Sequence, residues 1–200
     1  MTMLKFSAGL LFIFLFVTFP TIAQLLDSTA LSNKTIYTLE EALLFPEQVY
    51  KLSLKKTKPE QFPDLQQFKN LQWLCLSRNK LTEIPEQVFY QMNLQYLDLS
   101  KNKIDLIPKE IGNLINIKQL YLHQNNIASL PPQISQLINL ELIDLWDNEI
   151  SVLPDEIKAL KNLKRLDLRN IQINDNEQKK ISSLLPETKI FFSPACNCKY

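Results

Sequence analysis

Only a few side chains in this sequence could take part in catalysis or bind a metal ion. The 200 residues include three cysteines, one histidine and two glycines. Cys75 and His123 could act as a nucleophile and its base if the fold brought them within hydrogen-bond reach, about 2.6–3.2 Å. Asp144 and Asp167 could act as a paired general acid and base at similarly close range. Each possibility depends on the elements that position these residues.

These elements recur at a fixed interval. Segments of similar sequence begin at Leu71, Leu94, Ile117, Leu140 and Leu163, each 23 residues after the one before. The first four copies have apolar residues at steps 1, 4, 6, 11, 14 and 18, Asn at step 9 and Pro at step 15. A period of 20–29 residues with this arrangement indicates stacked coils, each of which buries its apolar side chains against its neighbours.

The repeat resembles the leucine-rich-repeat family, in the variety whose second half reads L-P-x-x-I-x-x-L. That half runs from Ile107 to Leu114 in the clearest copy and recurs from Leu130 and from Leu153. Secreted bacterial proteins, notably a spirochaetal group, and eukaryotic intracellular scaffolds are similar. The resemblance covers about residues 36–192 and implies an α/β leucine-rich-repeat solenoid. Its partner has to be argued from the residues that the solenoid presents.

The alternation within one coil predicts which side chains face inward. Leu97 and Leu99 share one face of a short strand, while Tyr96 and Asp98 point to the other face. We therefore expect six parallel strands on a concave face, and short helices or 3-10 turns that begin at the prolines on the convex side. The asparagine amides can satisfy buried backbone groups in the turns. They are expected to stack as a ladder of Asn79, Asn102, Asn125 and Asn148.

Both ends of the array depart from the repeat pattern, as caps should. Thr38 and Glu41 have the spacing of a capping box, so residues 36–46 are predicted to form an N-terminal capping helix. Downstream, a longer helix is predicted over residues 175–185, followed by a short strand at residues 190–192. The expected organisation is a signal peptide (1–23), an N-terminal segment and capping helix (24–48), repeats (49–173) and a C-terminal cap with a cysteine-containing tail (174–200).

The first 23 residues have the composition of a secretory signal peptide. Lys5 precedes an apolar run from Gly9 to Phe19, and Thr21 and Ala23 place small residues at minus three and minus one of the expected cleavage site. The run is short for a membrane span, which needs about 20 apolar residues. We therefore expect the mature chain to be secreted, periplasmic or at the cell surface, without stable membrane insertion.

The charge balance argues against nucleic acid as a partner. Removal of the signal peptide takes Lys5 from the 22 basic residues and leaves 21 basic against 21 acidic residues, a net charge of zero. Nucleic-acid-binding domains are strongly basic. Glycine occurs only at Gly9 and Gly112, so the sequence lacks the glycine-rich loops that bind phosphate groups. No cofactor is predicted.

The outward positions of the predicted strands gather aromatic and charged side chains. Exposed aromatic groups on a sheet are costly unless a partner covers them, and Trp and Tyr dominate binding hot spots. Basic residues at the N-terminal end and aspartates at the other end predict a bipolar face that could orient a protein partner. The plainer interpretation is that aromatic residues simply favour strands. The predicted partner-binding residues are Trp73, Tyr96, Asp98, Tyr121, His123, Asp144, Trp146 and Arg165.

Strand geometry speaks against catalysis on this face. Cys75 and His123 lie two strands and two residues apart, roughly 12 Å, which is far beyond hydrogen-bond reach. Asp144 and Asp167 adjoin, but the arginines beside them favour charge balance over acid–base chemistry. No catalytic residue is predicted, and the chain is not expected to be an enzyme.

Two cysteines, Cys196 and Cys198, lie close together near the C-terminus. They could form a tight disulfide with each other, pair with another molecule or tie down the tail. Zinc normally takes four ligands and the chain has one histidine, so no metal site is predicted.

The favoured interpretation is an exported, non-catalytic module that binds a partner protein through the concave sheet. The resemblance to the spirochaetal group points to a host or matrix protein as the class of partner. One alternative is a structural or self-associating envelope protein, joined through Cys196 and Cys198 or through the flat ends of the stack. A second alternative is an intracellular scaffold whose N-terminus is not a signal peptide.

Overall fold

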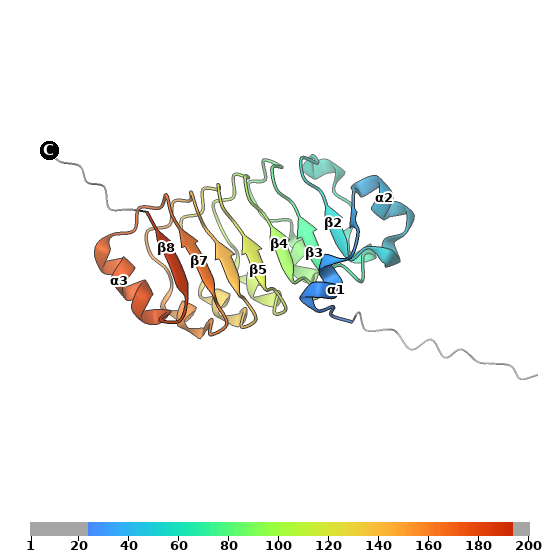
Figure 1. Ribbon diagram of the computed structural model, residues 1–200. Helices are drawn as coiled ribbons and strands as arrows, with labels where there is room; N and C mark the ends of the chain where they lie inside the picture. The colour runs from blue at the N-terminus through green and yellow to red at the C-terminus, as the bar shows by residue number, and fades with distance from the viewer. Residues whose placement is uncertain (1–23, 194–200) are drawn as a thin grey trace, which may run out of the picture.

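Within residues 24–193, eight short parallel strands lie side by side and form a single sheet in the order β1 to β8 (Figure 1). The computed structural model describes residues 24–193; the expected signal peptide, Cys196 and Cys198 lie outside the described residues. The strands are β1 (Ile36–Tyr37), β2 (Lys51–Ser53), β3 (Trp73–Cys75), β4 (Tyr96–Asp98), β5 (Gln119–Tyr121), β6 (Leu142–Asp144), β7 (Arg165–Leu168) and β8 (Lys189–Phe192). The parallel solenoid expected from the repeat period is confirmed.

The strand count differs from the six expected for the repeats. Strands β2–β7 are the six predicted repeat strands, and β8 is the predicted final strand. The addition is β1, because residues 36–37 were expected to begin the capping helix and instead pair with Lys51 and Leu52 of β2. This pairing covers a sheet edge whose backbone groups would otherwise be open.

The N-terminal helix consequently starts later than predicted. Helix α2 (Leu39–Leu44) begins after Thr38, whose backbone N–H donates to Glu41 Oε2 at 3.0 Å. A shorter helix that the sequence did not predict, α1 (Ser28–Ser32), precedes β1 and is capped by the side chain of Asp27. At the other end, α3 (Asp175–Leu184) matches the predicted helix and is capped by Asn174, which accepts from the backbone N–H of Glu177 at 3.0 Å.

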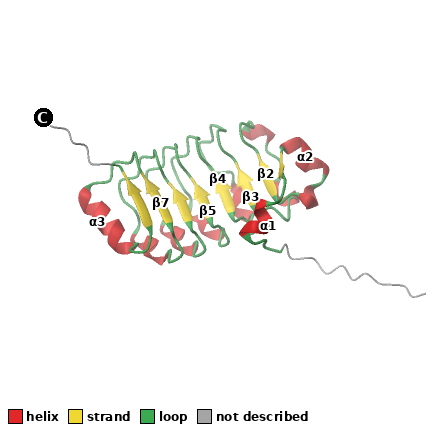
Figure 2. Cartoon of the chain, in the orientation of Figure 1, coloured by secondary structure: helices red, strands yellow, loops and turns green. Residues whose placement is uncertain are grey.

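Short 3-10 helices return the chain behind the sheet (Figure 2). They are η1 (Pro46–Gln48), η2 (Pro59–Gln61), η3 (Leu65–Gln67), η4 (Glu86–Tyr90), η5 (Lys109–Asn113), η6 (Pro132–Gln136) and η7 (Asp155–Ala159). The repeat prolines precede η4–η7 by one residue, at the N-cap rather than at the predicted first position. The N-cap suits proline because it needs no amide donor, and the carbonyl of Pro108 accepts the first helical bond from Ile111 at 3.1 Å.

The space between the sheet and the 3-10 helices holds one continuous apolar core. Leu94, Leu97, Leu99, Ile104 and Ile111 are all fully buried, and the same steps are buried in the neighbouring coils. Alternate residues of the same strand, such as Tyr96 and Asp98, remain partly exposed on the other face. The predicted separation of inner and outer side chains therefore holds through the repeats.

Four buried asparagines connect successive coils through their amides. Asn102 Nδ2 donates to Leu99 O of its own coil at 2.8 Å and to Leu76 O of the preceding coil at 3.1 Å. Its Oδ1 accepts from the backbone N–H groups of Asn79 and Leu81 at 2.9 and 3.1 Å. Asn125 and Asn148 repeat three of these four bonds one and two coils later: the two donated to carbonyls and the one accepted from the N–H at step 11.

The ladder ends at its first member. Asn79 Nδ2 donates to Leu54 O and Leu76 O, but Asn79 Oδ1 is buried without a protein partner in the described part of the chain. In the other coils, the asparagine Oδ1 accepts from the backbone N–H at step 11 of the preceding coil. In the unit that begins at Val49, step 11 is Pro59, and proline has no backbone N–H to donate.

Candidate binding face on the parallel sheet

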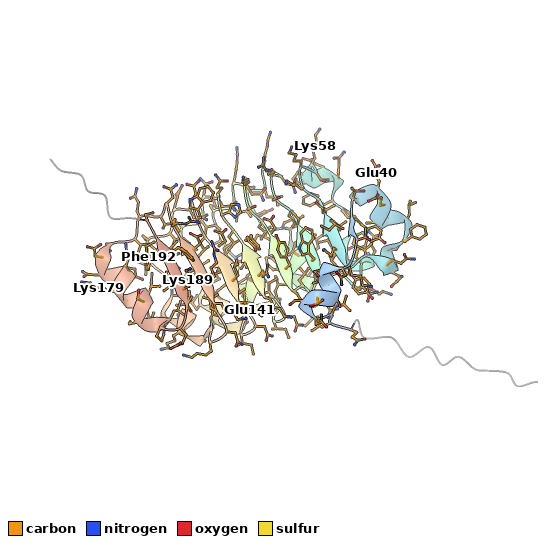
Figure 3. The ribbon with its side chains drawn as sticks, in the orientation of Figure 1. Glu40, Lys58, Glu141, Lys179, Lys189 and Phe192 are labelled. Atoms are coloured by element: carbon orange, nitrogen blue, oxygen red, sulfur yellow. The ribbon has the colours of Figure 1, made fainter. Side chains whose placement is uncertain are left out.

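The sheet face, by which we mean the outward side chains of β2–β8 together with those of His123, Trp146 and Arg169 just beyond the strands, is arranged in straight rows by the strand register. Residues at the third step of each coil pair directly across neighbouring strands, and those at the fifth step do the same. The first row is Lys51, Trp73, Tyr96, Gln119, Leu142, Arg165 and Lys189; the second is Ser53, Cys75, Asp98, Tyr121, Asp144, Asp167 and Phe191. Figure 3 shows Lys189 at the C-terminal end of this face.

Three aromatic rings form a strip across β3–β5. The ring centroids of Trp73 and Tyr96 are 4.7 Å apart and nearly parallel, at 15°. Tyr96 and Tyr121 follow at 5.1 Å with a tilt of 39°. All three side chains are half-buried, and burial, followed by the charge of nearby Asp98, raises the pKa of Tyr96. The strip therefore offers an uncharged aromatic surface.

A second group lies two residues beyond the fifth step of the coils, on the same face. The His123 and Trp146 rings are 5.8 Å apart, and His123 Nδ1 lies 3.2 Å from Asp144 Oδ2. That separation is within ion-pair distance, but His123 Nδ1 is buried and makes no hydrogen bond within the described residues. Asp144 Oδ1 accepts from the backbone N–H of Trp146 at 3.1 Å. Asp144 thus lies against both residues of this group and bonds to the backbone of Trp146.

Cys75 is placed as a structural residue. Its side chain is buried, with Sγ 3.2 Å from Ser77 Oγ and 3.4 Å from Asp98 Oδ2. Burial raises the pKa of the Cys75 thiol, the Ser77 hydroxyl opposes this rise, and the Asp98 carboxylate adds to it. The thiol is therefore protonated at neutral pH, and Asp98 rather than an imidazole is its ionisable neighbour.

Asp167 departs from the exposed aspartate that the sequence predicted. Its side chain is only 1% exposed and accepts hydrogen bonds from Arg169 Nε at 2.8 Å and from an Arg165 terminal nitrogen at 3.2 Å. Burial by itself would raise the pKa of Asp167, but the hydrogen bonds from Arg169 and then from Arg165 outweigh it and hold the pKa below its ordinary value. Asp144 and Asp167 are neighbours across β6 and β7, but the Asp167 carboxylate bonds to arginines and not to Asp144.

This environment gives Asp167 a testable effect on stability. Its folded-state pKa lies below the unfolded value of about 3.9, so its contribution is complete above that pH and is lost as the pH falls through the folded-state pKa. Asp167→Asn should lower the free energy of unfolding by about 2 kcal/mol at pH 7, since it removes charge-assisted bonds to two arginines. Urea unfolding at pH 7 and pH 3 should show the gap between variant and parent closing at the lower pH.

The matched control for that measurement is Asp105→Asn, which removes an exposed aspartate that makes no ion pair in the described residues. Its effect should stay within about 0.5 kcal/mol at both pH values. A gap between Asp167→Asn and the parent that persists unchanged at pH 3 would contradict the assignment.

The C-terminal end of the sheet face displays positive charge as well as the aspartates that the sequence placed there. Arg165, Arg169 and Lys189 are exposed around the Phe191 ring, with their charged groups 4.7, 5.8 and 5.1 Å from its centroid. Asp167 is hidden beneath the arginines. The burial of Asp167, unlike its position on the strand, could not be read from the sequence.

Sequence reasoning also missed two buried glutamines that hold the N-terminal segment. Gln72 Oε1 accepts from Leu26 N at 2.9 Å, and its Nε2 donates to Gln24 O at 2.9 Å. Gln95 Nε2 donates to Leu26 O at 2.7 Å and to Gln72 Oε1 at 2.8 Å. Both glutamines occupy step 2 of their coils, and this 23-residue spacing was the available signal.

The eight predicted binding residues all lie on the sheet face but form three groups. Trp73, Tyr96 and Tyr121 form the aromatic strip, with Asp98 between them in the second row. His123, Asp144 and Trp146 form the second group, and Arg165 belongs to the cationic end. Between residues 24 and 193, no group of three or more His, Cys, Asp or Glu side chains could hold a metal ion. No helix within the same range is long and apolar enough to cross a membrane.

Known proteins share this architecture. The family described as leucine-rich repeat region matches residues 48–185. A solved leucine-rich repeat protein of Leptospira interrogans is 39% identical with a TM-score of 0.64, over 72% of this chain and 36% of that one. An internalin of Listeria monocytogenes is 22% identical with a TM-score of 0.61, over 75% of this chain and 44% of that one, and supports the fold alone. No curated protein matches the sequence.

The chain thus spans less than half the length of both structural relatives. Solenoids of this kind commonly bind other proteins along an extended surface and are typically not catalytic. The 23-residue period, the parallel sheet and the match over residues 48–185 together place this chain in the leucine-rich repeat family.

Proposed function

We propose that this chain is a non-catalytic module that recognises a partner protein through the sheet face. The observation that carries the proposal is the aromatic strip, in which Trp73, Tyr96 and Tyr121 stack on neighbouring strands without any part of residues 24–193 covering them fully. Trp and Tyr are the residues that most often dominate protein interfaces. The second group, around His123 and Trp146, extends the same surface toward the cationic end.

Export belongs to the same proposal. It is supported by the composition of residues 1–23, and the similarity to the Leptospira protein makes a host or matrix protein the first class of partner to test. Capture of candidate extracellular proteins by the immobilised chain identifies the partner. Sequencing of the mature N-terminus tests cleavage after Ala23, and an intact N-terminus on protein kept inside the cell would favour an intracellular scaffold.

The binding prediction concerns three aromatic residues together. The triple variant Trp73→Ala, Tyr96→Ala and Trp146→Ala should bind the captured partner at least 100-fold more weakly, since each hot-spot residue contributes about 2 kcal/mol or more and about 1.4 kcal/mol is tenfold in affinity. Surface plasmon resonance measures the affinities, and circular dichroism verifies that the variant remains folded.

A matched control removes as many apolar side chains elsewhere. Met92, Ile115 and Ile138 are 56%, 45% and 57% exposed and lie outside the sheet face. Their triple alanine variant should retain the parent affinity. Equal binding by the aromatic variant and this control would refute the sheet face as the binding surface.

Self-association is the second candidate, and one observation favours it. End caps of solenoids normally have a polar outer face. Here Leu43, Leu44 and Phe45 at the N-terminal cap are 49%, 71% and 56% exposed, and Ile36 is 48% exposed. If these residues join two copies, Leu44→Lys with Phe45→Lys should convert a dimer to a monomer in sedimentation velocity, while the aromatic triple variant keeps the dimer.

A further inference from the structure

A small pocket lies where α1 meets the sheet face. Its volume is about 220 Å³, and its walls include Leu31 of α1, Lys51 of β2, the stacked rings of Trp73 and Tyr96, and Lys118. In Figure 1, α1 lies in front of one end of β3 and β4. The pocket is therefore the point where the aromatic strip meets the N-terminal segment.

Specific contacts hold α1 in this place. Gln72 and Gln95 bind the backbone of Gln24 and Leu26 just before the helix, and Leu31 is buried against the sheet with 7% exposure. The two glutamines are themselves buried, at 0% and 4% exposure. The wall that α1 contributes is consequently a fixed part of the fold.

The pocket contains a buried cation without a counter-charge. Lys51 is 9% exposed, and its Nζ donates one hydrogen bond, to Ser32 O at 3.3 Å. Nζ also lies 5.8 Å from the centroid of the Trp73 ring. No carboxylate within residues 24–193 comes within ion-pair distance of Nζ, although an ammonium group has three donors.

A buried charge is costly unless it is paired. The opposite wall adds a second lysine, Lys118, and no residue that lines the pocket is acidic. An anionic group that entered would pair with Lys51, while its apolar part would lie on the Trp73 and Tyr96 rings. The cavity has features of a site whose occupant is a carboxylate attached to a short apolar stem.

We propose that this pocket anchors a single glutamate or aspartate side chain of the partner protein, with its carboxylate on Lys51 Nζ. The inference rests on the proposed function and names the chemistry of the partner. The volume is below the roughly 300 Å³ at which pockets accommodate whole small-molecule ligands, so one side chain is the appropriate occupant. The chain that carries it continues over the aromatic strip toward β5.

The test uses blocked peptides, which need no identified partner. The protein has two tryptophans, and Trp146→Phe assigns their indole N–H resonances. N-acetyl-Ala-Glu-Ala-amide should shift the Trp73 resonance on titration, and the glutamine peptide should bind at least tenfold more weakly. Lys51→Met should reduce the affinity for the glutamate peptide at least tenfold. Lys55→Met, which removes an exposed lysine from the same coil, should leave it unchanged.

Three results would overturn the assignment. They are equal shifts with the glutamate and glutamine peptides, undiminished glutamate binding by Lys51→Met, and an equally strong response to inorganic phosphate, which would indicate a general anion site. Thermal unfolding keeps the test decisive: Lys51→Met should match or exceed the parent midpoint, and a large fall would show that α1 already satisfies the amine. Peptide binding can fail while the aromatic variant still abolishes partner binding, so the two proposals stand or fall separately.

Discussion

Asn102→Ala is expected to lower the free energy of unfolding by about 4 kcal/mol, because it removes five buried hydrogen bonds, four of them at 3.1 Å or shorter and worth roughly 1 kcal/mol each. The Asn102 amide donates to Leu76 O and Leu99 O and accepts from Asn79 N and Leu81 N, so two coils lose their connection together. Alanine leaves these backbone groups buried and without partners. Urea unfolding followed by circular dichroism measures the difference.

Asn116, in the same coil, provides the matched control for Asn102→Ala. Its amide also donates to a carbonyl of the preceding coil, Met92 O at 2.9 Å, but the bond lies at the solvent-exposed edge, where water can replace it. Asn116→Ala should therefore cost only about 0.5 kcal/mol. Equal losses in the two variants would show that burial of the ladder does not determine its contribution.

Leu120→Ala should destabilise the protein by about 3–5 kcal/mol, the usual range for a truncated core leucine whose cavity cannot collapse. Leu120 is fully buried at the centre of β5, with Leu97 and Ile143 as its direct neighbours on β4 and β6. The apolar stack continues on both sides, so neighbouring coils cannot move in to fill the space. Denaturant unfolding monitored at several wavelengths measures the loss and tests whether the coils unfold together.

The adjacent residue gives the corresponding control. Gln119 precedes Leu120 on the same strand, points to the sheet face and is exposed. Gln119→Ala should change the free energy of unfolding by no more than about 0.5 kcal/mol. If Gln119→Ala cost as much as Leu120→Ala, the strand would not have the side-chain register described for β5.

These variants separate stability from recognition. The ladder asparagines and core leucines hold the coils in register, and the register in turn aligns the aromatic side chains. Trp73 and Tyr96 are direct partners across β3 and β4 only because Leu74 and Leu97 are paired beneath them. A variant that weakens the core should therefore lower binding only together with folding, whereas the aromatic triple variant should lower binding alone.

The sequence by itself determined the repeat architecture and the two rows of outward residues. A constant spacing of 23 residues puts the same residue type in the same place of every coil, so Leu97 and Tyr96 could be assigned to opposite faces without coordinates. The neighbour of each residue on the next strand lies 23 positions later in the sequence. The prediction held wherever a contact repeats with the period of the chain.

Only the tertiary structure decided the features that lack this period. Residues 36–37 form a strand instead of a helix because the open edge of β2 is available to them. Gln72 binds Leu26, 46 residues earlier, and this contact builds the pocket around Lys51. Asp167 was predicted as an exposed acid, yet two arginines cover it and the face displays their positive charge.

The physical reason is that periodicity fixes which side of a coil a residue occupies, but not how much solvent reaches it there. Burial and charge depend on the side chains of other strands and on segments outside the repeats, which no spacing in the sequence relates to the site. The leucine and asparagine positions of the solenoid were therefore readable from the sequence alone. The depth of the Lys51 pocket and the sign of the exposed charge around Phe191 required the folded arrangement.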